Sequence, residues 1–259
     1  MGSQVLTPER CRQNLSQVRL VATDMDGTLT TQGEFAPALL QAFEQLSGQG
    51  IQVMIVTGRS AGWVSGLVNY LPVVGAIAEN GGLYFSKRTL EPWILPDIPQ
   101  IETHRTRLSR LFETLRVQYP HLRPSVDNPY RLTDWTFDIT GLSRADITAL
   151  QSACAQQRMG FTYSNVQCHL KLAQQDKATG LAKVLAQEFP QVRADQVVTV
   201  GDSPNDESLF DPQRFPLSVG VANVAEYLPV LAYSPKYLTN AAAGQGFAEL
   251  ARHLVRAVA

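Results

Sequence analysis

The sequence alternates apolar runs of strand length with helical patterns, and this order constrains the fold more than any other feature. Apolar runs lie at 18–23, 51–57 and 73–82, the last ending in a turn, and helical patterns at 37–50 and 60–71 separate them. Strands buried on both faces are continuously apolar, as in a parallel sheet covered by helices. The order therefore predicts a parallel sheet with helices on both faces.

The same alternation returns in the last third of the chain. A helical pattern at 178–189 precedes an apolar run at 196–201, and another run follows at 217–223. A helix is expected to open at 204–210, and an amphipathic pattern occupies 246–259. We expect these elements to extend the first sheet, which makes the fold class α/β with a doubly wound Rossmann-like core.

The segment between these two parts has a different pattern. Residues 101–119 have a helical pattern, and 131–139 alternate polar and apolar side chains. A second helix is expected after Ser143, an N-cap residue, and two short strands should flank Ser164 and Asn165. Alternation is typical of an antiparallel sheet with one face covered by helices. We therefore expect an inserted α/β cap, and the division is a core of 1–83 and 174–259 with the cap at 84–173.

The composition excludes several classes of function. The chain has 259 residues, 44% of them hydrophobic, and its 22 Lys and Arg against 23 Asp and Glu leave no basic excess for nucleic acid. It has no apolar leader and no run of about 18 apolar residues, so no membrane partner is expected. Three isolated cysteines, Cys11, Cys154 and Cys168, fit neither disulfides nor zinc and favour a reducing, cytoplasmic setting.

Two aspartates follow the first apolar run, where a strand would end. Asp24 and Asp26 come directly after 18–23, and Gly27 permits a tight turn. In parallel sheets, ligands bind at the carboxyl ends of the strands. Carboxylates this close repel each other unless a cation or a shared proton relieves them. Mg²⁺, which takes oxygen ligands from carboxylates and phosphate, is the natural choice.

Other strand ends carry matching side chains. Asp202 and Asp206 follow an apolar run, and Pro204 between them starts a helix whose N–H groups could face an anion. Thr57 follows the second run and would offer a hydroxyl beside a free backbone N–H. Lys177 precedes the helix with which the core resumes. We expect these side chains to meet in one crevice.

Four short motifs carry a family resemblance. DMDGTLT, IVTGRS, a lysine before a helix, and GDSPND occur in this order. Together they resemble the motifs of the haloacid dehalogenase superfamily of phosphohydrolases. The insertion after the second motif and the ENGG at 79–82, which would form a hinge or only a turn, resemble the type IIB cap of the Cof-like, sugar-phosphatase branch. Within this branch the chain resembles sucrose-phosphate phosphatase and mannosyl-3-phosphoglycerate phosphatase, and the sequence does not choose between them.

The resemblance implies a mechanism at the matching positions. Asp24 would be the nucleophile that takes the phosphoryl group, and Asp26 would act as general acid and then as base. Mg²⁺ would be held by the side chains of Asp24 and Asp202 and by the backbone carbonyl of Asp26. The phosphate would be contacted by Thr57, Gly58, Lys177 and Asn205, and of these Thr57 and Lys177 would also be catalytic. Asp206 would support the lysine or a metal-bound water.

The third motif departs from the family pattern. Lys177 is followed by Ala-Thr before Gly180, rather than directly by glycine. Lys171 and Lys183 are the neighbouring alternatives. The first lies in an alternating strand and the second inside a helix, so we favour Lys177.

The cap offers weaker signals. Arg131, Trp135 and His169 are the expected substrate contacts, because Arg and aromatic side chains suit sugar phosphates. The competing interpretation gives these strands one solvated face and one helix-packing face. We expect Trp63 to lie in the core and His104 at the surface.

We therefore predict a Mg²⁺-dependent phosphatase that hydrolyses a small phosphorylated metabolite, a sugar or polyol phosphate, through an aspartyl-phosphate. The cap would close over the crevice and exclude water from the first step. Two alternatives remain: a phosphomutase of related fold, which passes the phosphoryl group to a second hydroxyl, and a non-catalytic module that only binds phosphate.

Overall fold

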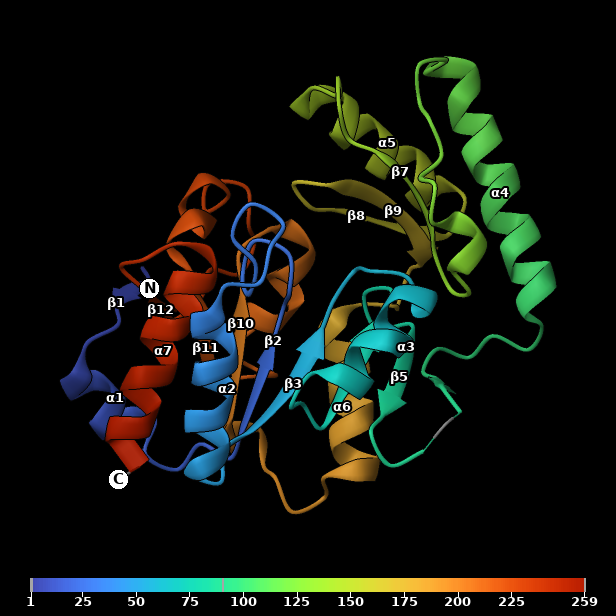
Figure 1. The fold of residues 1–259 in the computed structure, drawn as a ribbon. Coiled ribbons are helices and arrows are strands. Elements are labelled where there is room, and N and C mark those ends of the chain that lie inside the picture. Colours follow the sequence, from blue (N-terminus) through green and yellow to red (C-terminus); the bar gives the residue numbers. More distant parts are fainter. Residues whose placement is uncertain (1, 90, 259) are drawn as a thin grey trace.

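The computed structural model describes residues 2–89 and 91–258, and its strands form two separate sheets (Figure 1). The strands of the large sheet are β1 (Gln4–Val5), β2 (Leu20–Thr23), β3 (Gln52–Val56), β4 (Gly75–Ala78), β5 (Leu83–Ser86), β6 (Trp93–Ile94), β10 (Val197–Gly201), β11 (Leu217–Gly220) and β12 (Tyr237–Leu238). Their order across the sheet is β1-β12-β11-β10-β2-β3-β4-β5-β6. All neighbours from β1 to β4 pair in parallel, which confirms the predicted doubly wound α/β core.

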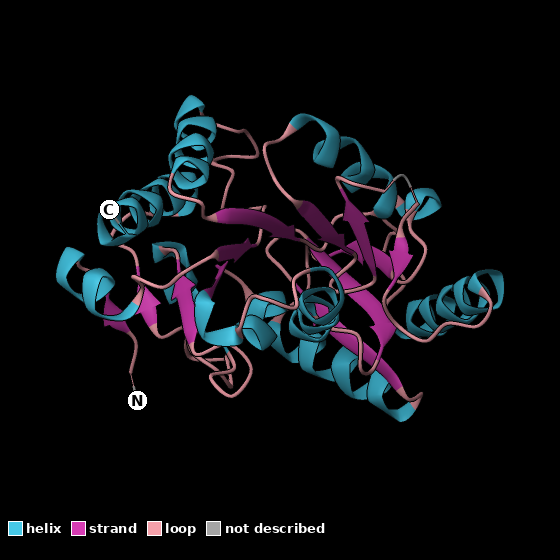
Figure 2. Cartoon of the chain, turned by 90° about the horizontal axis from the view of Figure 1, so that it is seen from below, coloured by secondary structure: helices cyan, strands magenta, loops and turns pink. Residues whose placement is uncertain are grey.

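Helices cover both faces of the large sheet (Figure 2). They are α1 (Pro8–Asn14), α2 (Pro37–Gly48), α3 (Ala61–Tyr70), α6 (Lys177–Glu188) and α7 (Ala243–Val258), with 3-10 turns η2 (Ala194–Gln196), η3 (Pro204–Phe210) and η4 (Ala222–Glu226). Because side chains alternate along a strand, Val21 packs in one buried cluster with Phe43 and Phe247, whereas Ala22 packs in another with Leu181. The helix expected at 204–210 is present, but it is a 3-10 helix rather than an α-helix.

The central strand β2 has β10 on one side and β3 on the other. These neighbours come from opposite ends of the sequence, so the chain reverses its winding direction at β2. A crevice opens beyond the carboxyl ends of the strands at such a point. This topology places the loops after β2, β3 and β10 around one crevice.

The expected border of the cap at residue 84 falls inside β5. This strand pairs antiparallel with β4, and β6 pairs antiparallel with β5, so the chain adds two strands to the core sheet before it leaves. Residue 84 is thus wrong as a border, because Tyr84 pairs with Ile77 of β4. We propose that the cap begins after Ile94 and ends before α6.

The second sheet belongs to the inserted segment. Its strands are β7 (Trp135–Asp138), β8 (Met159–Tyr163) and β9 (Gln167–Leu172), in the antiparallel order β7-β9-β8, and its helices are α4 (Ile101–Gln118) and α5 (Arg144–Gln156), with a 3-10 turn η1 (Asn128–Tyr130). The helices lie on one face, where Phe112, Phe137 and Leu150 share a buried cluster. Ser143 caps α5 as predicted, since its hydroxyl accepts a hydrogen bond from the Asp146 N–H.

The other face of the cap sheet looks toward the core. In Figure 1, β8 and β9 lie above the ends of the core strands. Thr136, His169 and Thr162 are paired neighbours on this face, and His169 and Lys171 are only 2% and 6% exposed. The expectation of a solvated face is therefore wrong: the core covers it.

Candidate active site

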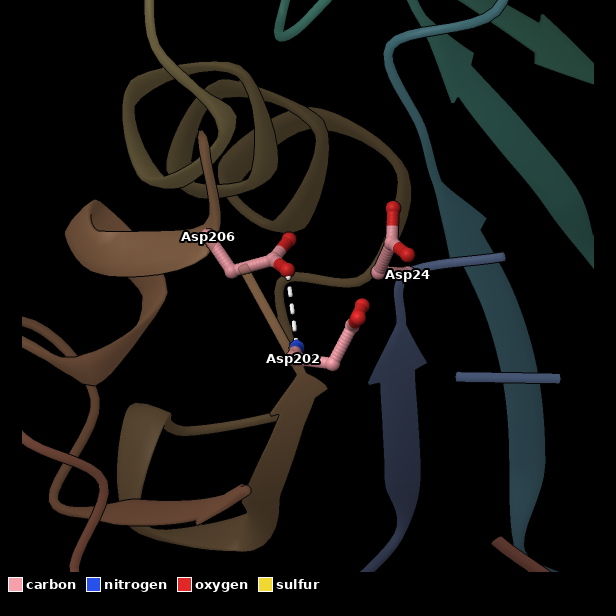
Figure 3. A group of neighbouring side chains, drawn as sticks. All are labelled: Asp24, Asp202 and Asp206. Atoms are coloured by element: carbon pink, nitrogen blue, oxygen red, sulfur yellow. Dashed lines mark hydrogen bonds between the residues drawn. The ribbon is translucent and has the colours of Figure 1, made fainter. Parts of the chain in front are cut away.

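Three buried carboxylates gather at the strand ends and form the carboxylate cluster, Asp24, Asp202 and Asp206 (Figure 3). The Asp24 N–H donates to Val200 O at 2.9 Å, which extends the pairing of β2 with β10 by one residue. One carboxylate oxygen from each aspartate lies within 4.8 Å of the other two. This spacing makes Asp24 and Asp202 candidate ligands of one cation.

Lys177, the first residue of α6, enters this cluster. Its Nζ donates to Asp24 Oδ1 and to Asp206 Oδ1, both at 2.6 Å, and the lysine side chain is fully buried. The alternatives lie elsewhere, because Lys171 Nζ donates to Gln175 O and Lys183 Nζ donates to Leu95 O. The structure therefore brings Lys177, and neither neighbour, to Asp24.

Asp206 has both carboxylate oxygens engaged by the protein. Besides Lys177, it accepts hydrogen bonds from the backbone N–H groups of Asp202 at 2.9 Å and Ser203 at 3.1 Å. Among the residues that the structure describes, the Asp24 carboxylate is hydrogen-bonded by Lys177 alone, on Oδ1. Asp206 thus positions the lysine, while Asp24 keeps an oxygen for other chemistry.

Asp202 is held by two side chains that the sequence analysis missed. Thr28 Oγ1 donates to its Oδ1 at 3.0 Å, and Asn223 Nδ2 donates to its Oδ2 at 2.8 Å. Gly27 has φ +82°, and a Cβ there would lie 2.5 Å from Asp202 Oδ2, so only glycine fits this turn. Asn223 follows β11, and the strand-end rule that identified Asp24 could have found it.

The charges in the carboxylate cluster do not balance. Three aspartates face one lysine, which leaves two negative charges if all are ionised. Burial and the charge of Asp206 raise the pKa of Asp24 to about 7, although Lys177 opposes the shift. Burial and Asp24 likewise raise the pKa of Asp202 well above its usual range.

A divalent cation would remove this imbalance. Hard oxygen donors at this spacing suit Mg²⁺ or a similar ion, and Asp24 and Asp202 are the residues that would hold it. Burial would lower the pKa of Lys177, but Asp206 and Asp24 raise it above its usual value, so the lysine stays charged. The residues present therefore fit a divalent metal.

Asp26 lies apart from the cluster and pairs with Arg59. The guanidinium binds both carboxylate oxygens, Nε to Oδ2 at 2.8 Å and Nη2 to Oδ1 at 2.6 Å. The Arg59 side chain is 30% exposed and the Asp26 side chain is 23% exposed. Sequence reasoning missed Arg59, although it stands in IVTGRS two residues after Thr57.

Thr57 and Gly58 form the edge of the site after β3. The sequence analysis expected a free backbone N–H at this strand end. The Thr57 N–H is instead bonded, because it donates to Ile77 O at 2.8 Å within the sheet. Its hydroxyl oxygen accepts from the Arg59 N–H at 3.2 Å and keeps its own proton to donate. A Cβ at Gly58 would lie 3.1 Å from His169 Cε1, so core and cap meet closely here.

These side chains line one small cavity, the catalytic cavity. Its volume is about 20 Å³, and its walls are Asp24, Asp26, Thr57, Gly58, Arg59, Ser203 and Asn205 of the core and Ser164, Val166, Gln167 and His169 of the cap. The β8–β9 loop thus contributes Ser164 and Val166, which the sequence analysis did not propose as contacts. A larger groove of about 630 Å³ on the outer face of the cap, beside Arg107 and Met159, lacks the carboxylates and the lysine.

The proposed cap contacts divide three ways. His169 lines the cavity, and its Nδ1 lies 2.9 Å from Asp134 Oδ2. Arg131 does not line it: the guanidinium is buried and donates to Gly58 O and Asp134 Oδ1, both at 2.9 Å, which joins cap to core. Trp135 points to the helical face, 5.9 Å from Phe112 between ring centroids, because alternation along β7 turns it away from the core.

Glu79 ties the core to the cap. Its buried carboxylate accepts hydrogen bonds from Ala61 N at 2.9 Å, Leu132 N at 3.0 Å, Thr133 N at 2.6 Å and Thr133 Oγ1 at 2.7 Å. Glu79 and Asn80 both have φ +52°. The ENGG segment therefore does more than turn the chain, because it binds the loop before β7.

Two other expectations about side chains are wrong. His104 is buried rather than at the surface, with Nε2 2.9 Å from Thr133 O. Trp63 is 44% exposed rather than in the core, and Arg59 lies over its ring. His104 is buried by its contact with the loop before β7, which is distant in the sequence, and no local pattern predicts either environment.

Across residues 2–89 and 91–258, no helix is both long and apolar enough for a membrane span. A doubly wound core whose strand ends gather three carboxylates and a lysine beneath a cap has the groups that phosphoryl-transfer chemistry with a divalent cation requires.

Comparison with known proteins shows which enzymes this chain resembles. A model of the haloacid dehalogenase-like hydrolases matches residues 21–93. The chain is 26% identical over 242 residues to a phosphoglycolate phosphatase of Methanothrix thermoacetophila, which covers 92% of this chain and 97% of that protein. The chain is similar to the haloacid dehalogenase-like hydrolases over residues 21–93 and to a phosphoglycolate phosphatase over most of its length, and it is a phosphatase.

Solved structures share the whole fold. The structure of Thermoplasma acidophilum 0175 superposes with a TM-score of 0.74 at 20% identity, covering 92% of this chain and 99% of that one. The sucrose-phosphatase of Synechocystis sp. PCC6803 superposes with a TM-score of 0.66 at 16% identity, covering 92% and 98%. Core and cap therefore occur together in these proteins.

Proposed function

We propose that this phosphatase is Mg²⁺-dependent and hydrolyses a small phosphate monoester through an aspartyl-phosphate on Asp24. The observation that carries the proposal is the carboxylate cluster, in which one oxygen of Asp24 is held by Lys177 and two negative charges remain unbalanced. A phosphoryl-transfer site needs positioned positive charge more than any other feature.

The metal would be held by the side chains of Asp24 and Asp202, with the backbone carbonyl of Asp26 as a further ligand. When bound, Mg²⁺ would neutralise charge on the phosphate and on the attacking carboxylate. Thr28 and Asn223 would keep Asp202 oriented through its two oxygens.

The chain's own residues would carry two steps. In the first, an Asp24 oxygen attacks phosphorus, the bond from phosphorus to the ester oxygen breaks, and Asp26 gives a proton to the leaving alcohol. In the second, Asp26 takes a proton from water, whose oxygen attacks phosphorus and releases Asp24. Lys177 would stabilise the phosphoryl oxygens, while Thr57, the Gly58 N–H and Asn205 would donate to them.

The substrate is proposed to be small. A cavity of about 20 Å³ leaves little room between Asp24 and the β8–β9 loop, so the cap must shift to admit any ester. The smallest ester requires the smallest shift of the cap. The relative named as a phosphoglycolate phosphatase supports a two-carbon ester. A sugar or polyol phosphate, as in the sucrose-phosphatase of similar fold, is the second candidate.

The three buried free cysteines support the cytoplasm as the compartment.

A panel of phosphate esters assayed with and without Mg²⁺ tests the proposal. We expect phosphate release that requires Mg²⁺, that favours phosphoglycolate over glucose 6-phosphate and sucrose 6-phosphate, and that disappears in Asp24→Asn. Transfer of the phosphoryl group to a second hydroxyl without release would favour the phosphomutase alternative. Undiminished release by Asp24→Asn would contradict the aspartyl-phosphate.

A further inference from the structure

Arg59 has a contact that is incompatible with the chemistry proposed for its partner. Its guanidinium binds both oxygens of Asp26, at 2.8 and 2.6 Å. Asp26 can serve an ester oxygen only when one of its own oxygens faces that atom. A bidentate arginine takes one lone pair of each oxygen, and a carboxyl that carries the proton for the leaving alcohol cannot accept both guanidinium N–H groups. Arg59 must therefore move when Asp26 acts on the substrate.

A displaced guanidinium needs another anion. Arg59 is the only permanently cationic side chain among the described residues that line the catalytic cavity. The other arginine nearby is committed, because Arg131 is buried and donates to Asp127, Asp134, Gln167 and Gly58 O. The new partner must therefore come with the substrate.

The position of Arg59 indicates which part of the substrate it meets. Lys177 is hydrogen-bonded to Asp24 and Asp206, on the side where phosphorus would be attacked. Arg59 is bound to Asp26, which must face the opposite, leaving-group side. In a cavity this small, a charged group one or two carbons from the ester oxygen falls within reach of that guanidinium.

We propose that Arg59 is a specificity-determining residue that binds a carboxylate on the leaving group, so that its preferred substrate is a short phosphate ester of a hydroxy acid. Arg59 exchanges the carboxylate of Asp26 for that of the substrate, because a planar guanidinium binds either in the same two-point geometry. The exchange frees Asp26 only when a carboxylate is present. This inference rests on the proposed hydrolysis at Asp24.

Trp63 supports the moving side chain. The Arg59 Cζ lies 5.1 Å from the centre of the indole ring, which is 44% exposed. A cation that stays over an aromatic face keeps a favourable contact while its hydrogen-bond partner changes. Arg59 can thus swing between two carboxylates without leaving the cavity edge.

The test compares two esters of equal length, phosphoglycolate and 2-hydroxyethyl phosphate, which differ in a carboxylate against a hydroxymethyl group. We expect the wild-type enzyme to favour phosphoglycolate in kcat/KM. Arg59→Gln should lower that preference ~10–100-fold, through a higher KM for phosphoglycolate and a higher kcat for 2-hydroxyethyl phosphate, for which Asp26 is then free. Arg59→Lys should keep part of the preference, because it retains the charge but loses the two-point contact. Arg193→Gln, which removes an exposed arginine paired with Asp195, is the matched control and should change neither rate.

A second measurement needs no variant. Glycolate should inhibit the wild-type enzyme, and ethylene glycol should not, since only glycolate offers Arg59 a carboxylate. An equal loss on both esters in Arg59→Gln, or equal inhibition by both alcohols, would overturn the role of Arg59 while leaving the hydrolase intact. Failure of the wild-type enzyme to release phosphate from either ester would instead contradict the proposed function.

Discussion

Two buried polar regions of this molecule differ in how their charges are satisfied. In the carboxylate cluster, Asp24, Asp202 and Asp206 face one lysine. At the contact between core and cap, Arg131 is matched by carboxylates, and Glu79 is matched by four N–H or O–H donors. A region that is already satisfied stabilises the fold, whereas a region with unbalanced charge is prepared for ions that arrive from solution.

The largest expected effect is on catalysis in the unbalanced region. Asp24→Asn should lower kcat at least ~10⁴-fold, because it removes the proposed nucleophile. In metal-free protein, the same change should leave the melting temperature equal or higher, since it removes one of the repelling charges. Steady-state kinetics and thermal melts in chelator measure the two, and a large fall in melting temperature would contradict the contrast between the regions.

A change in the satisfied region should act on stability instead. Burial opposes ionisation of Asp134, yet the charge of Arg131 and the hydrogen bond to His169 hold its pKa below the usual range. Asp134→Asn should therefore cost about 3–5 kcal/mol of unfolding free energy, because Arg131 stays buried without its fully buried charge partner and keeps only the partly exposed Asp127. Urea denaturation measures this cost, with Asp195→Asn, in an exposed pair, as the control. Equal costs for the two variants would argue against a structural role for the contact.

Asp202→Asn should act through the metal. We expect the Mg²⁺ concentration for half-maximal activity to rise at least ~10–100-fold. Mg²⁺ at about 100 times its dissociation constant should also stabilise the wild-type protein by ~2.7 kcal/mol, and this gain should shrink in the variant. Mg²⁺ titrations of rate and of melting temperature test both effects. An unchanged Mg²⁺ requirement would remove Asp202 from the metal site.

The smallest effect concerns Glu79 and depends on pH. Glu79→Ala should cost about 1–3 kcal/mol, because it leaves buried donors at Ala61, Leu132 and Thr133 unpaired. Burial, with the charge of Asp134, raises the pKa of Glu79 from an ordinary 4.5 to about 7. The folded state then binds the proton more tightly than the unfolded state, so the stability from this group is full below pH 4.5 and is lost as the pH rises toward 7.

The stability difference between the wild-type protein and Glu79→Ala should therefore narrow from pH 5 to pH 7.5. Denaturation curves at several pH values give this difference, and Glu44→Ala, an exposed site on α2, should show no such trend. A difference that widens with pH would mean that Glu79 is more acidic in the folded protein than in the unfolded chain.

The sequence was most informative where function follows directly from a strand end. Asp24 and Asp202 come right after apolar runs, so parallel pairing of those runs had to bring them to one rim. Trp135 and Arg131 of the cap could not be placed in this way. Alternation with a period of two predicts which residues share a face of the sheet, but it does not predict what covers that face. Arg59 and Asn223 were missed because neither stands directly after its strand, since β3 ends at Val56 and β11 at Gly220.

Short elements were also beyond the sequence. β1, β12 and β6 have two residues each, too few for any periodicity, and they form only because a neighbouring strand is already present. β5 and β6 also form because a neighbouring strand is present, and they add to the core sheet in antiparallel order. The cap therefore begins later in the chain than the sequence predicted. Burial of His104 depends on a contact with Thr133, 29 residues away, which no local pattern encodes.

The most direct test of the account is to trap the phosphoryl group on Asp24. Borohydride reduces an acyl phosphate to an alcohol, so quenching the enzyme during turnover would convert the modified aspartate to homoserine, which peptide mass spectrometry locates. We predict homoserine at position 24 only when phosphate ester and Mg²⁺ are both present. Active turnover with position 24 unmodified, or with another residue reduced, would contradict the account.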